Sequence, residues 1–248
     1  MAGSLEGRRA VVTGASSGIG EATVEALVRE GAAVAVGARR RDRLEALAQR
    51  VDGTVHVHEV DITDESAARR FIDDSAAALD GLDILVNNAG VMLLGPVAGA
   101  EVEHWRRMID VNLLGLLYCT HATLPIMGEG GGGHIVNVSS VAGRQATLGS
   151  AVYNMTKFGV VAFSEALRQE VLHANVRVTC VEPGFVDTEL QGHNEHPTVV
   201  EAIEKMRTDL GDGVLKAADI ADAIVYALSR PPHVAINEVL VRPTRQSR

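Results

Sequence analysis

A hydroxyl, a phenol and an ammonium occur at a spacing that could carry out proton transfer. Twelve residues separate Ser140 from Tyr153, and Lys157 lies four positions after Tyr153. Side chains four residues apart share one face of a helix. A free tyrosine has a pKa of about 10, and a neighbouring cation lowers that pKa by favouring the phenolate. The pattern indicates a phenol that exchanges a proton with an alcohol or carbonyl; the alternative is a helix with a half-buried Tyr and a surface Lys.

A glycine-rich turn that could receive a phosphate lies near the N-terminus. Its sequence, GASSGIG over Gly14–Gly20, joins the apolar run 9–13 to a helical pattern. A strand–turn–helix of this kind presents backbone N–H groups and a helix N-terminus to a pyrophosphate. The spacing is GxxxGxG rather than GxGxxG. A glycine turn that binds no ligand is the alternative interpretation.

The second apolar run, 33–37, ends in Ala38, Arg39 and Arg40, where a dinucleotide-binding fold selects its nucleotide. An acidic residue there accepts hydrogen bonds from the ribose of NAD, whereas a basic residue pairs with the 2′-phosphate of NADP. Ala38 carries no carboxylate and Arg39 carries a fork-shaped cation, so we predict NADP(H). The alternative is a solvated arginine cluster at the start of a helix, and Asp42 nearby complicates the assignment.

Polar residues follow two further apolar runs. Asn87 comes directly after the run 83–86, and Ser140 comes shortly after the run 134–138. The carboxyl ends of parallel strands are where ligands bind in open α/β folds, although Asn87 could equally be a turn former. Asn112 lies within an apolar helical stretch. Because a buried Asn needs hydrogen-bond partners, it either ties down a neighbouring element or belongs to a polar network.

Apolar runs and helical patterns alternate along the whole chain, which predicts an α/β fold with one doubly wound, Rossmann-type parallel sheet of about seven strands and helices on both faces. The 248 residues, 46% of them hydrophobic and 3% aromatic, fit a single domain over 1–248 with an aliphatic core. The predicted strands are 9–13, 33–37, 55–60, 83–86, 134–138, 176–181 and 235–241, and the predicted helices include 41–51, 65–79, 102–127, 152–173 and 217–229.

The segment 189–214 is the least regular part of the chain, with a short helical pattern over 199–207. Long irregular insertions in compact domains are often lids or binding loops, so we predict a substrate lid. His193 and His196 fall within it. A zinc pair is the alternative, but no Cys or carboxylate supports it, and we expect no metal.

Composition argues against several classes of function. The net charge is −9 and the longest basic run is Arg39–Arg41, which disfavours a nucleic-acid surface. No apolar segment of about 18–20 residues suggests a membrane span, and the first residues lack a signal-peptide pattern. Cys119 and Cys180 lie in apolar runs and are expected to be buried thiols. We therefore expect a cytoplasmic protein with no membrane or nucleic-acid partner.

Taken together, the motifs resemble those of the short-chain dehydrogenase/reductases over nearly the whole chain. They are TGASSGIG at 13–20, NNAG at 87–90, Asn112, Ser140, Tyr153 with Lys157, and Pro183-Gly184. The resemblance implies reversible hydride transfer between NADP(H) and a carbonyl/alcohol pair. A NADP(H)-binding regulator or scaffold without turnover is the alternative. The resemblance also implies a homo-oligomer, with a tetramer favoured and a dimer as the alternative.

The resemblance assigns roles to individual residues. Tyr153 would be the acid/base, Lys157 would bind the nicotinamide ribose and lower the pKa of Tyr153, Ser140 would hold the substrate oxygen, and Asn112 would anchor a water chain to Lys157. Some NADP-binding members carry a basic residue where this chain has Ser17. The implied cofactor contacts are Gly14, Ser16, Ser17, Gly18, Ile19, Gly20, Arg39, Asp61, Ile62, Asn87, Ala89, Gly90, Tyr153, Lys157, Pro183, Gly184, Val186 and Thr188.

Residues 91–96 and 238–244 resemble a bacterial subgroup that includes the clavulanate-forming aldehyde reductase and 3-hydroxy-acid dehydrogenases. Substrate does not transfer safely within a family, because the fold is shared while the pocket varies. The expected substrate determinants are Met92, Val141, Arg144, Phe185 and the segment 189–214. Arg144 and His193 either select an anionic substrate or face water.

Overall fold

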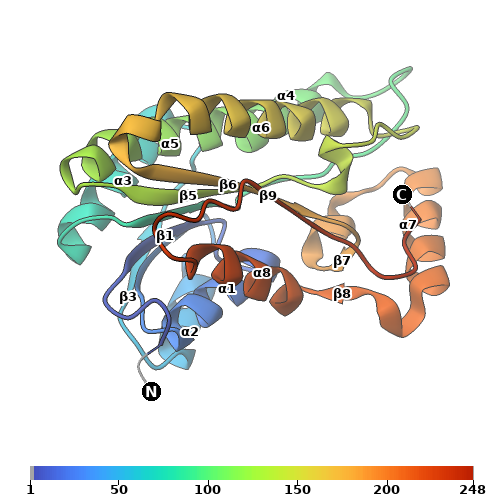
Figure 1. Cartoon of the computed structure of the whole chain (residues 1–248). Coiled ribbons are helices and arrows are strands. Elements are labelled where there is room, and N and C mark those ends of the chain that lie inside the picture. The colour runs from blue at the N-terminus through green and yellow to red at the C-terminus, as the bar shows by residue number, and fades with distance from the viewer. Residues whose placement is uncertain (1–2, 248) are drawn as a thin grey trace.

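The computed structural model describes residues 3–247 and contains a seven-stranded sheet in which every neighbouring pair is parallel (Figure 1). The strand order is β3-β2-β1-β4-β5-β6-β9, and the short strands β7 and β8 form a separate parallel pair. This confirms the predicted doubly wound sheet. The strands are β1 Arg9–Thr13, β2 Ala33–Ala38, β3 Val55–Glu59, β4 Ile84–Asn87, β5 Gly133–Val138, β6 Val176–Pro183, β7 Val186–Asp187, β8 Leu215–Lys216 and β9 Glu238–Val241.

Helices cover both faces of the sheet (Figure 1). Helices α1, α2 and α8 lie on one face, while α3, α4, α5 and α6 lie on the other. Helix α7 lies beyond the sheet, at the end of the molecule where the C-terminal tail also ends. The helices are α1 Gly18–Arg29, α2 Arg41–Arg50, α3 Glu65–Leu79, α4 Val102–Ile109, α5 Leu116–Glu129, α6 Ala151–Glu170, α7 Pro197–Leu210 and α8 Ala217–Leu228.

The strands are apolar throughout because both faces of the sheet are covered. Successive residues of a strand point to opposite faces. In β1, Ala10 and Val12 therefore pack with Leu27 and the α1/α8 layer, whereas Val11 packs into the second core with Ile135. This aliphatic core, almost free of aromatic rings, holds the strand ends at fixed positions.

The topology places a crevice at the carboxyl ends of β1 and β4. The chain runs from β1 through β2 to β3 at one edge of the sheet. It then returns to the middle, where β4 lies beside β1, and continues through β5 and β6 to β9 at the other edge. The connections that leave β1 and β4 run to opposite faces of the sheet, which opens a crevice at this switch point. The glycine turn after Thr13 and the NNAG segment that begins at Asn87 lie there.

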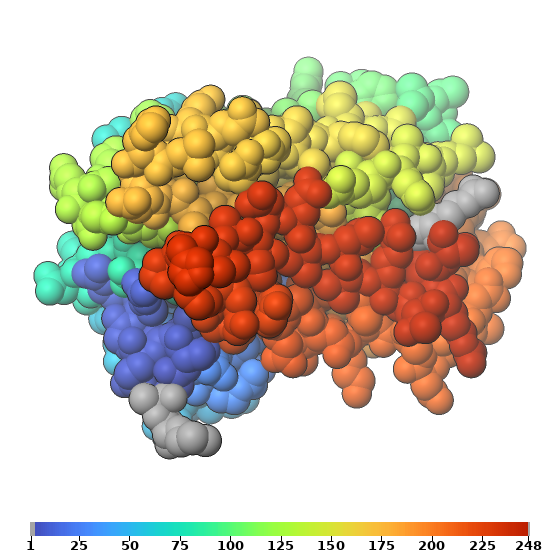
Figure 2. Space-filling model, in the orientation of Figure 1, coloured from blue at the N-terminus to red at the C-terminus, as the bar shows by residue number. Residues whose placement is uncertain are grey.

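Two parts of the chain differ from the helices expected from sequence. The stretch 102–127 is interrupted by a π-helical segment, Asp110–Gly115, between α4 and α5. The segment 189–214 is more regular than expected: a short 3₁₀ turn, Glu189–His193, is followed by the 14-residue helix α7, which starts at Pro197. Pro suits the first position of a helix, because the N–H that it lacks would have no partner within the helix at that position. In the space-filling view, this region and the C-terminal tail form one end of the molecule (Figure 2).

The helical run Val102–Glu129 contains an 18-residue window with a mean hydropathy of 1.2, so by length and composition alone it could cross a membrane. Its second half is α5, whose residues Cys119 and Met127 are fully buried in the core between this helix and the sheet. Helix α5 also packs against α3. A core helix of a globular protein has this combination of apolar composition and burial.

Candidate active site

The glycine turn after β1 has a backbone that only glycine adopts readily. Gly14 and Gly18 have φ angles of +66° and +57°. A Cβ on Gly14 would lie 2.7 Å from the Cα of Ala89, so the turn packs directly on the NNAG segment. Helix α1 starts at Gly18, and the side chain of its N-cap residue, Ser17, makes no capping hydrogen bond. The first N–H groups of α1 are therefore available to an anionic ligand.

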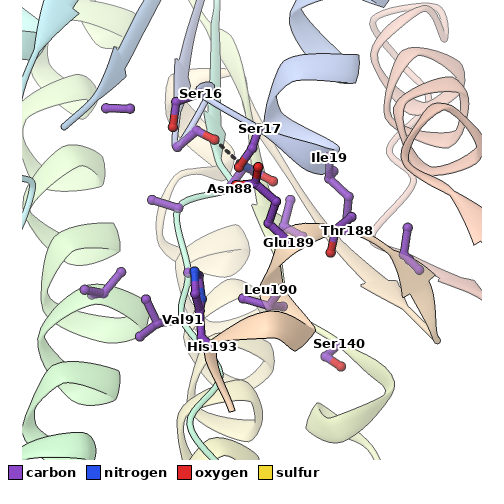
Figure 3. Close-up of a pocket in the computed structure, with 18 of the residues that line it drawn as sticks. Ser16, Ser17, Ile19, Asn88, Val91, Ser140, Thr188, Glu189, Leu190 and His193 are labelled. Atoms are coloured by element: carbon purple, nitrogen blue, oxygen red, sulfur yellow. Dashed lines mark hydrogen bonds between the residues drawn. The ribbon is translucent and has the colours of Figure 1, made fainter. Parts of the chain in front are cut away.

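A cavity of about 420 Å³ runs from this turn to the end of β5. Figure 3 shows Ser16 and Ser17 at one end and Ser140 at the other, with Glu189, Leu190 and His193 reaching in from the segment after β7. Most of the residues predicted to contact a cofactor line this cavity. They are Gly14, Ser16, Ser17, Gly18, Ile19, Arg39, Asp61, Ile62, Ala89, Gly90, Tyr153, Lys157, Pro183, Gly184, Val186 and Thr188.

Two predicted cofactor contacts, Gly20 and Asn87, do not line the cavity. Gly20 packs inside the turn, where a Cβ would lie 2.4 Å from the carbonyl oxygen of Gly14. The Asn87 side chain points into the core and donates to Asn137 Oδ1 (2.9 Å) and Thr120 Oγ1 (3.0 Å). These two residues therefore support the wall of the cavity from the protein interior without facing the cavity.

Asn88, which the sequence interpretation passed over, lines the cavity instead. Its Nδ2 donates to the carbonyl oxygens of Thr13 (3.0 Å) and Gly14 (3.2 Å), so it holds the glycine turn in place. Side chains alternate along an extended segment. Because Asn87 still belongs to β4 and points inward, the next residue points toward the crevice, and this alternation was the signal that could have found Asn88.

Tyr153 and Lys157 lie in the first two turns of α6 and meet at the inner end of the cavity. Lys157 Nζ lies 5.9 Å from the centroid of the Tyr153 ring. Both side chains are buried, with exposed fractions of 6% and 5%. Lys157 Nζ donates to the carbonyl oxygen of Val138 (3.0 Å), which anchors the ammonium beside the end of β5. The predicted alignment on one helix face is therefore present.

Burial controls the protonation of both groups. It raises the pKa of Tyr153 to about 12, and the nearby Ser140 hydroxyl offsets only part of this rise. It also lowers the pKa of Lys157 to about 8. The predicted lowering of the Tyr153 pKa by Lys157 is not seen, because the cost of removing the phenolate from water exceeds the effect of the Ser140 hydrogen bond. Tyr153 is protonated at neutral pH.

Ser140 stands at the entrance of a 3₁₀ turn, Val141–Gly143, directly after β5. Its Oγ accepts from the backbone N–H of Ala142 (3.1 Å), and its hydroxyl points toward the carbonyl oxygen of Pro183 at 3.4 Å. The first bond fixes the side-chain rotamer, and the second is long enough to be exchanged for another acceptor. Ser140 can therefore donate to an oxygen placed in the cavity beside Tyr153.

Asn112 lies within the π-helical segment and does not line the cavity. Its Oδ1 accepts from the N–H of Val91 (2.8 Å), and its Nδ2 donates to the carbonyl oxygen of Val91 (2.9 Å) and to Thr156 Oγ1 (3.2 Å). The side chain thus ties the segment after β4 to α6, the first of the two roles that sequence left open. π-segments of this kind often occur at functional sites, but no sequence pattern predicted this one.

Comparison with known proteins identifies the family. The model of the short chain dehydrogenase family matches residues 8–198. An uncharacterised oxidoreductase of Staphylococcus saprophyticus is 40% identical over 240 residues, covering 96% of both chains. This chain belongs to the short-chain dehydrogenase family. It is an oxidoreductase with the Rossmann-type fold of that family.

Other relatives carry more specific names. The glycine betaine reductase of Emericella nidulans is 43% identical over 244 residues; the match covers 97% of this chain but only 19% of that reductase. The closed form of a serine dehydrogenase complexed with NADP⁺ is 35% identical with a TM-score of 0.89, covering 96% of each chain. An alcohol dehydrogenase of Thermococcus sibiricus complexed with 5-hydroxy-NADP is 30% identical with a TM-score of 0.85, covering 97% of this chain and 98% of that one.

In this family member, a second cavity of about 280 Å³ adjoins the first and shares Tyr153 and His193 with it. Its walls are the segment 93–101, one side of α4 with Trp105, residues 149–153 at the start of α6, and residues 193–196. The Oδ1 of the buried Asn194 accepts from the N–H of Leu94 (2.7 Å), which joins the segment after β7 to the opposite wall.

Of the expected substrate determinants, the segment 189–214 lines the second cavity through residues 193–196. Met92, Val141 and Phe185 do not line the second cavity, although His193 does. Arg144 donates to the fully buried Glu182 (2.8 Å) and also pairs with Glu238. Two carboxylates therefore neutralise Arg144. It joins the Ser140 turn to the end of β6 and the start of β9, and its side chain remains 37% exposed to water, which is the second of the two alternatives.

Arg39 and Arg40 differ in their surroundings, although they are neighbours in sequence. Arg39 is exposed, lines the first cavity and makes no hydrogen bond or ion pair within residues 3–247. Arg40 donates to Ser16 Oγ, to Ser17 Oγ and to Glu189. Glu189 lies 149 residues further along the chain, so no sequence pattern could have paired it with Arg40.

Proposed function

We propose that this protein catalyses reversible, NADP(H)-dependent hydride transfer between an aldehyde or ketone and the corresponding alcohol. The observation that carries the proposal is the convergence of Ser140, Tyr153 and Lys157 at the inner end of a cavity whose outer end is a glycine turn flanked by Arg39. The names of the relatives, a serine dehydrogenase, an alcohol dehydrogenase and a betaine reductase, support the same class of reaction.

The residues present fit a dinucleotide. The positive φ angles of the turn and its close approach to Ala89 leave a cradle that side chains would fill. The uncapped N-terminus of α1 suits a pyrophosphate, and the unpaired Arg39 suits a 2′-phosphate. Gly90, Lys157 and Gly184 line the inner end, where the nicotinamide ribose would be held.

The chemistry divides between the cofactor and the protein. When bound, the nicotinamide supplies or accepts the hydride. With a pKa of about 12, Tyr153 is protonated at neutral pH and can deliver a proton to the carbonyl oxygen in reduction. Ser140 donates a hydrogen bond to the same oxygen and stabilises the charge that develops there. Lys157 would hold the nicotinamide ribose beside Tyr153 and so position the nucleotide for the transfer.

We assign the second cavity to the substrate and the segment 189–214 to a lid over it. Residues 193–196 contribute to the cavity wall and reach the opposite wall through Asn194, which supports this assignment. A substrate like those of the clavulanate-forming or 3-hydroxy-acid subgroup stays a prediction from residues 91–96 and 238–244. A cytoplasmic location is likewise a prediction of the sequence.

The reaction is tested by following nicotinamide absorbance with a panel of aldehydes, ketones and alcohols. Consumption of NADPH by a carbonyl, and its formation from the matching alcohol, would support the proposal. Tight nucleotide binding without consumption across the whole panel would instead support the alternative, a NADP(H)-binding regulator or scaffold.

Nucleotide preference has a separate test. NADPH should bind more tightly than NADH, and Arg39→Ala should weaken NADPH by about tenfold while leaving NADH nearly unchanged, because a charge-assisted hydrogen bond to the 2′-phosphate is lost. Titration of intrinsic fluorescence gives both dissociation constants. Arg41→Ala is the matched control, since Arg41 pairs with Glu45 and does not line the cavity. Equal affinities in the unmodified protein would refute the assignment.

We also propose a homo-oligomer, a tetramer or a dimer. Helices α4 and α6 pack side by side and leave large apolar side chains exposed, including Val102 (50%), Met155 (52%) and Phe158 (42%). Large apolar side chains left exposed on neighbouring helices are the kind of surface that a second chain can cover. Sedimentation velocity is expected to give a species of two or four 26.2 kDa chains. A monomer at micromolar concentration would contradict this proposal.

A further inference from the structure

Arg40 links the glycine turn to the first residues of the lid. Its Nη2 donates to Ser17 Oγ (2.8 Å) and Ser16 Oγ (3.1 Å), and its Nε also reaches Ser16 Oγ (3.2 Å). The remaining nitrogen, Nη1, donates to Glu189 Oε2 (2.8 Å). One guanidinium therefore spans the mouth of the cofactor cavity and uses a carboxylate of this chain as its only anionic partner in the described part of the chain.

Glu189 is held by two arginines. Its other oxygen, Oε1, accepts from Arg43 Nη1 at 2.5 Å. These two guanidinium groups lower the pKa of Glu189 to about 2, so the carboxylate is charged at every physiological pH. The residue lines the same cavity as Ser16, Ser17 and Arg39, and Figure 3 shows it alongside the serines of the turn.

A phosphate of the nucleotide would need the same donors. Arg39 and Arg40 are the arginines that line the turn end of the cavity, and Arg40 is already paired. A guanidinium binds a phosphate and a carboxylate through the same planar fork, so one anion must leave for the other to bind in full. A phosphate bound beside an undisplaced Glu189 would be repelled by it, since like charges a few ångströms apart disfavour one another.

We propose that Glu189 is an internal competitor for the 2′-phosphate of the nucleotide and so a determinant of cofactor affinity. The 2′-phosphate displaces the Glu189 carboxylate from Arg40, and the first turn of the lid is released from the glycine turn as the phosphate binds. This inference rests on the proposed use of NADP(H). It explains why a cavity with two arginines at its mouth also carries a carboxylate there.

The expected size of the effect follows from exposure. The Arg40 and Glu189 side chains are 41% and 47% exposed, so water screens the ion pair and its loss changes affinity only modestly. We therefore expect Glu189→Gln to tighten binding of a 2′-phosphate-bearing nucleotide by about three- to tenfold. NAD⁺, which lacks that phosphate, should change by less than about twofold.

The test measures dissociation constants of NADP⁺, NAD⁺, adenosine 2′,5′-bisphosphate and 5′-AMP by calorimetry for the unmodified protein and Glu189→Gln. Asp187→Asn is the matched control, because Asp187 is also an exposed, ion-paired carboxylate two residues away, bonded to Arg207 and outside the cavity lining. The proposal predicts that Glu189→Gln tightens only the two ligands with a 2′-phosphate, and that Asp187→Asn tightens none.

Two outcomes would overturn the proposal. Weaker or unchanged binding of the 2′-phosphate ligands in Glu189→Gln would mean that Glu189 orders the arginines for the ligand. Equal tightening of NADP⁺ and NAD⁺ binding would mean that Glu189 repels the pyrophosphate or only narrows the entrance of the cavity. Failure of the proposed function has a different signature: the unmodified protein would then bind NADP⁺ no more tightly than NAD⁺, and Arg39→Ala would change neither.

Discussion

Replacing Tyr153 with Phe should lower kcat by about 10²–10⁴-fold, because it removes the only hydroxyl that we assign to proton transfer. The ring is buried at 6% exposure and packs with Val91, Leu93 and Met108. Phenylalanine keeps that packing, so the variant should fold normally and bind NADPH as tightly as the unmodified protein. The loss should therefore fall on kcat rather than on nucleotide affinity.

Steady-state kinetics with the best substrate from the carbonyl panel, together with NADPH titration, gives both quantities. Tyr226→Phe is the matched control, since Tyr226 is 54% exposed on α8 and lies outside both cavities. Near-native turnover by Tyr153→Phe would disprove the proposed mechanism. A parallel loss of NADPH binding would mean that the phenol serves mainly to hold the nucleotide.

Replacing Lys157 with Met should make the protein more stable and inactive. Lys157 is a buried ammonium whose one hydrogen-bond partner among residues 3–247 is the carbonyl oxygen of Val138. Its pKa falls from 10.5 to about 8, which corresponds to a desolvation cost of about 3 kcal/mol. Losing the bond to Val138 costs about 1 kcal/mol. Methionine is similar in length and apolar, so a net gain of about 2 kcal/mol is expected at pH 7.

The pH dependence distinguishes this explanation from a simple packing gain. Below pH 8 the lysine is charged in both the folded and the unfolded chain, and the full desolvation cost is present. Between about pH 8 and 10.5 the folded lysine is neutral while the unfolded one still binds a proton, so the unmodified protein gains stability as pH rises. The advantage of Lys157→Met should therefore shrink across this window.

Urea unfolding of both proteins from pH 7 to pH 10 measures this difference. Lys205→Met is the control, because Lys205 is 72% exposed and pairs with Asp209 on the surface of α7. A Met variant that is less stable at pH 7, or an advantage that does not change with pH, would contradict the prediction. The gain in stability with loss of activity would show that the charge is kept for function.

The sequence by itself determined the sheet and most of the cofactor cavity. Apolar runs and helical periodicity are properties of neighbouring residues in the sequence. They predict the strands and helices correctly because both faces of the sheet are covered by helices. The glycine turn was visible for the same reason: the positive φ angles of Gly14 and Gly18 are a property of the local backbone. The i, i+4 spacing of Tyr153 and Lys157 likewise needed only a helix.

What sequence could not determine depends on which segments meet in space. The partners of Asn87 are Thr120 and Asn137, which lie 33 and 50 positions away in the sequence. Arg144 is paired with Glu182 and Glu238, residues from two other strands.

The remaining properties of the site also arise from tertiary packing. The Tyr153 pKa rises because the folded chain excludes water from the ring, and no spacing of residues encodes that burial. Arg40 meets Glu189 only because the fold brings the segment after β7 against the glycine turn. Local spacing in the sequence thus indicated which groups belong to the site. Burial and long-range contacts decided the charge states of these groups and their partners.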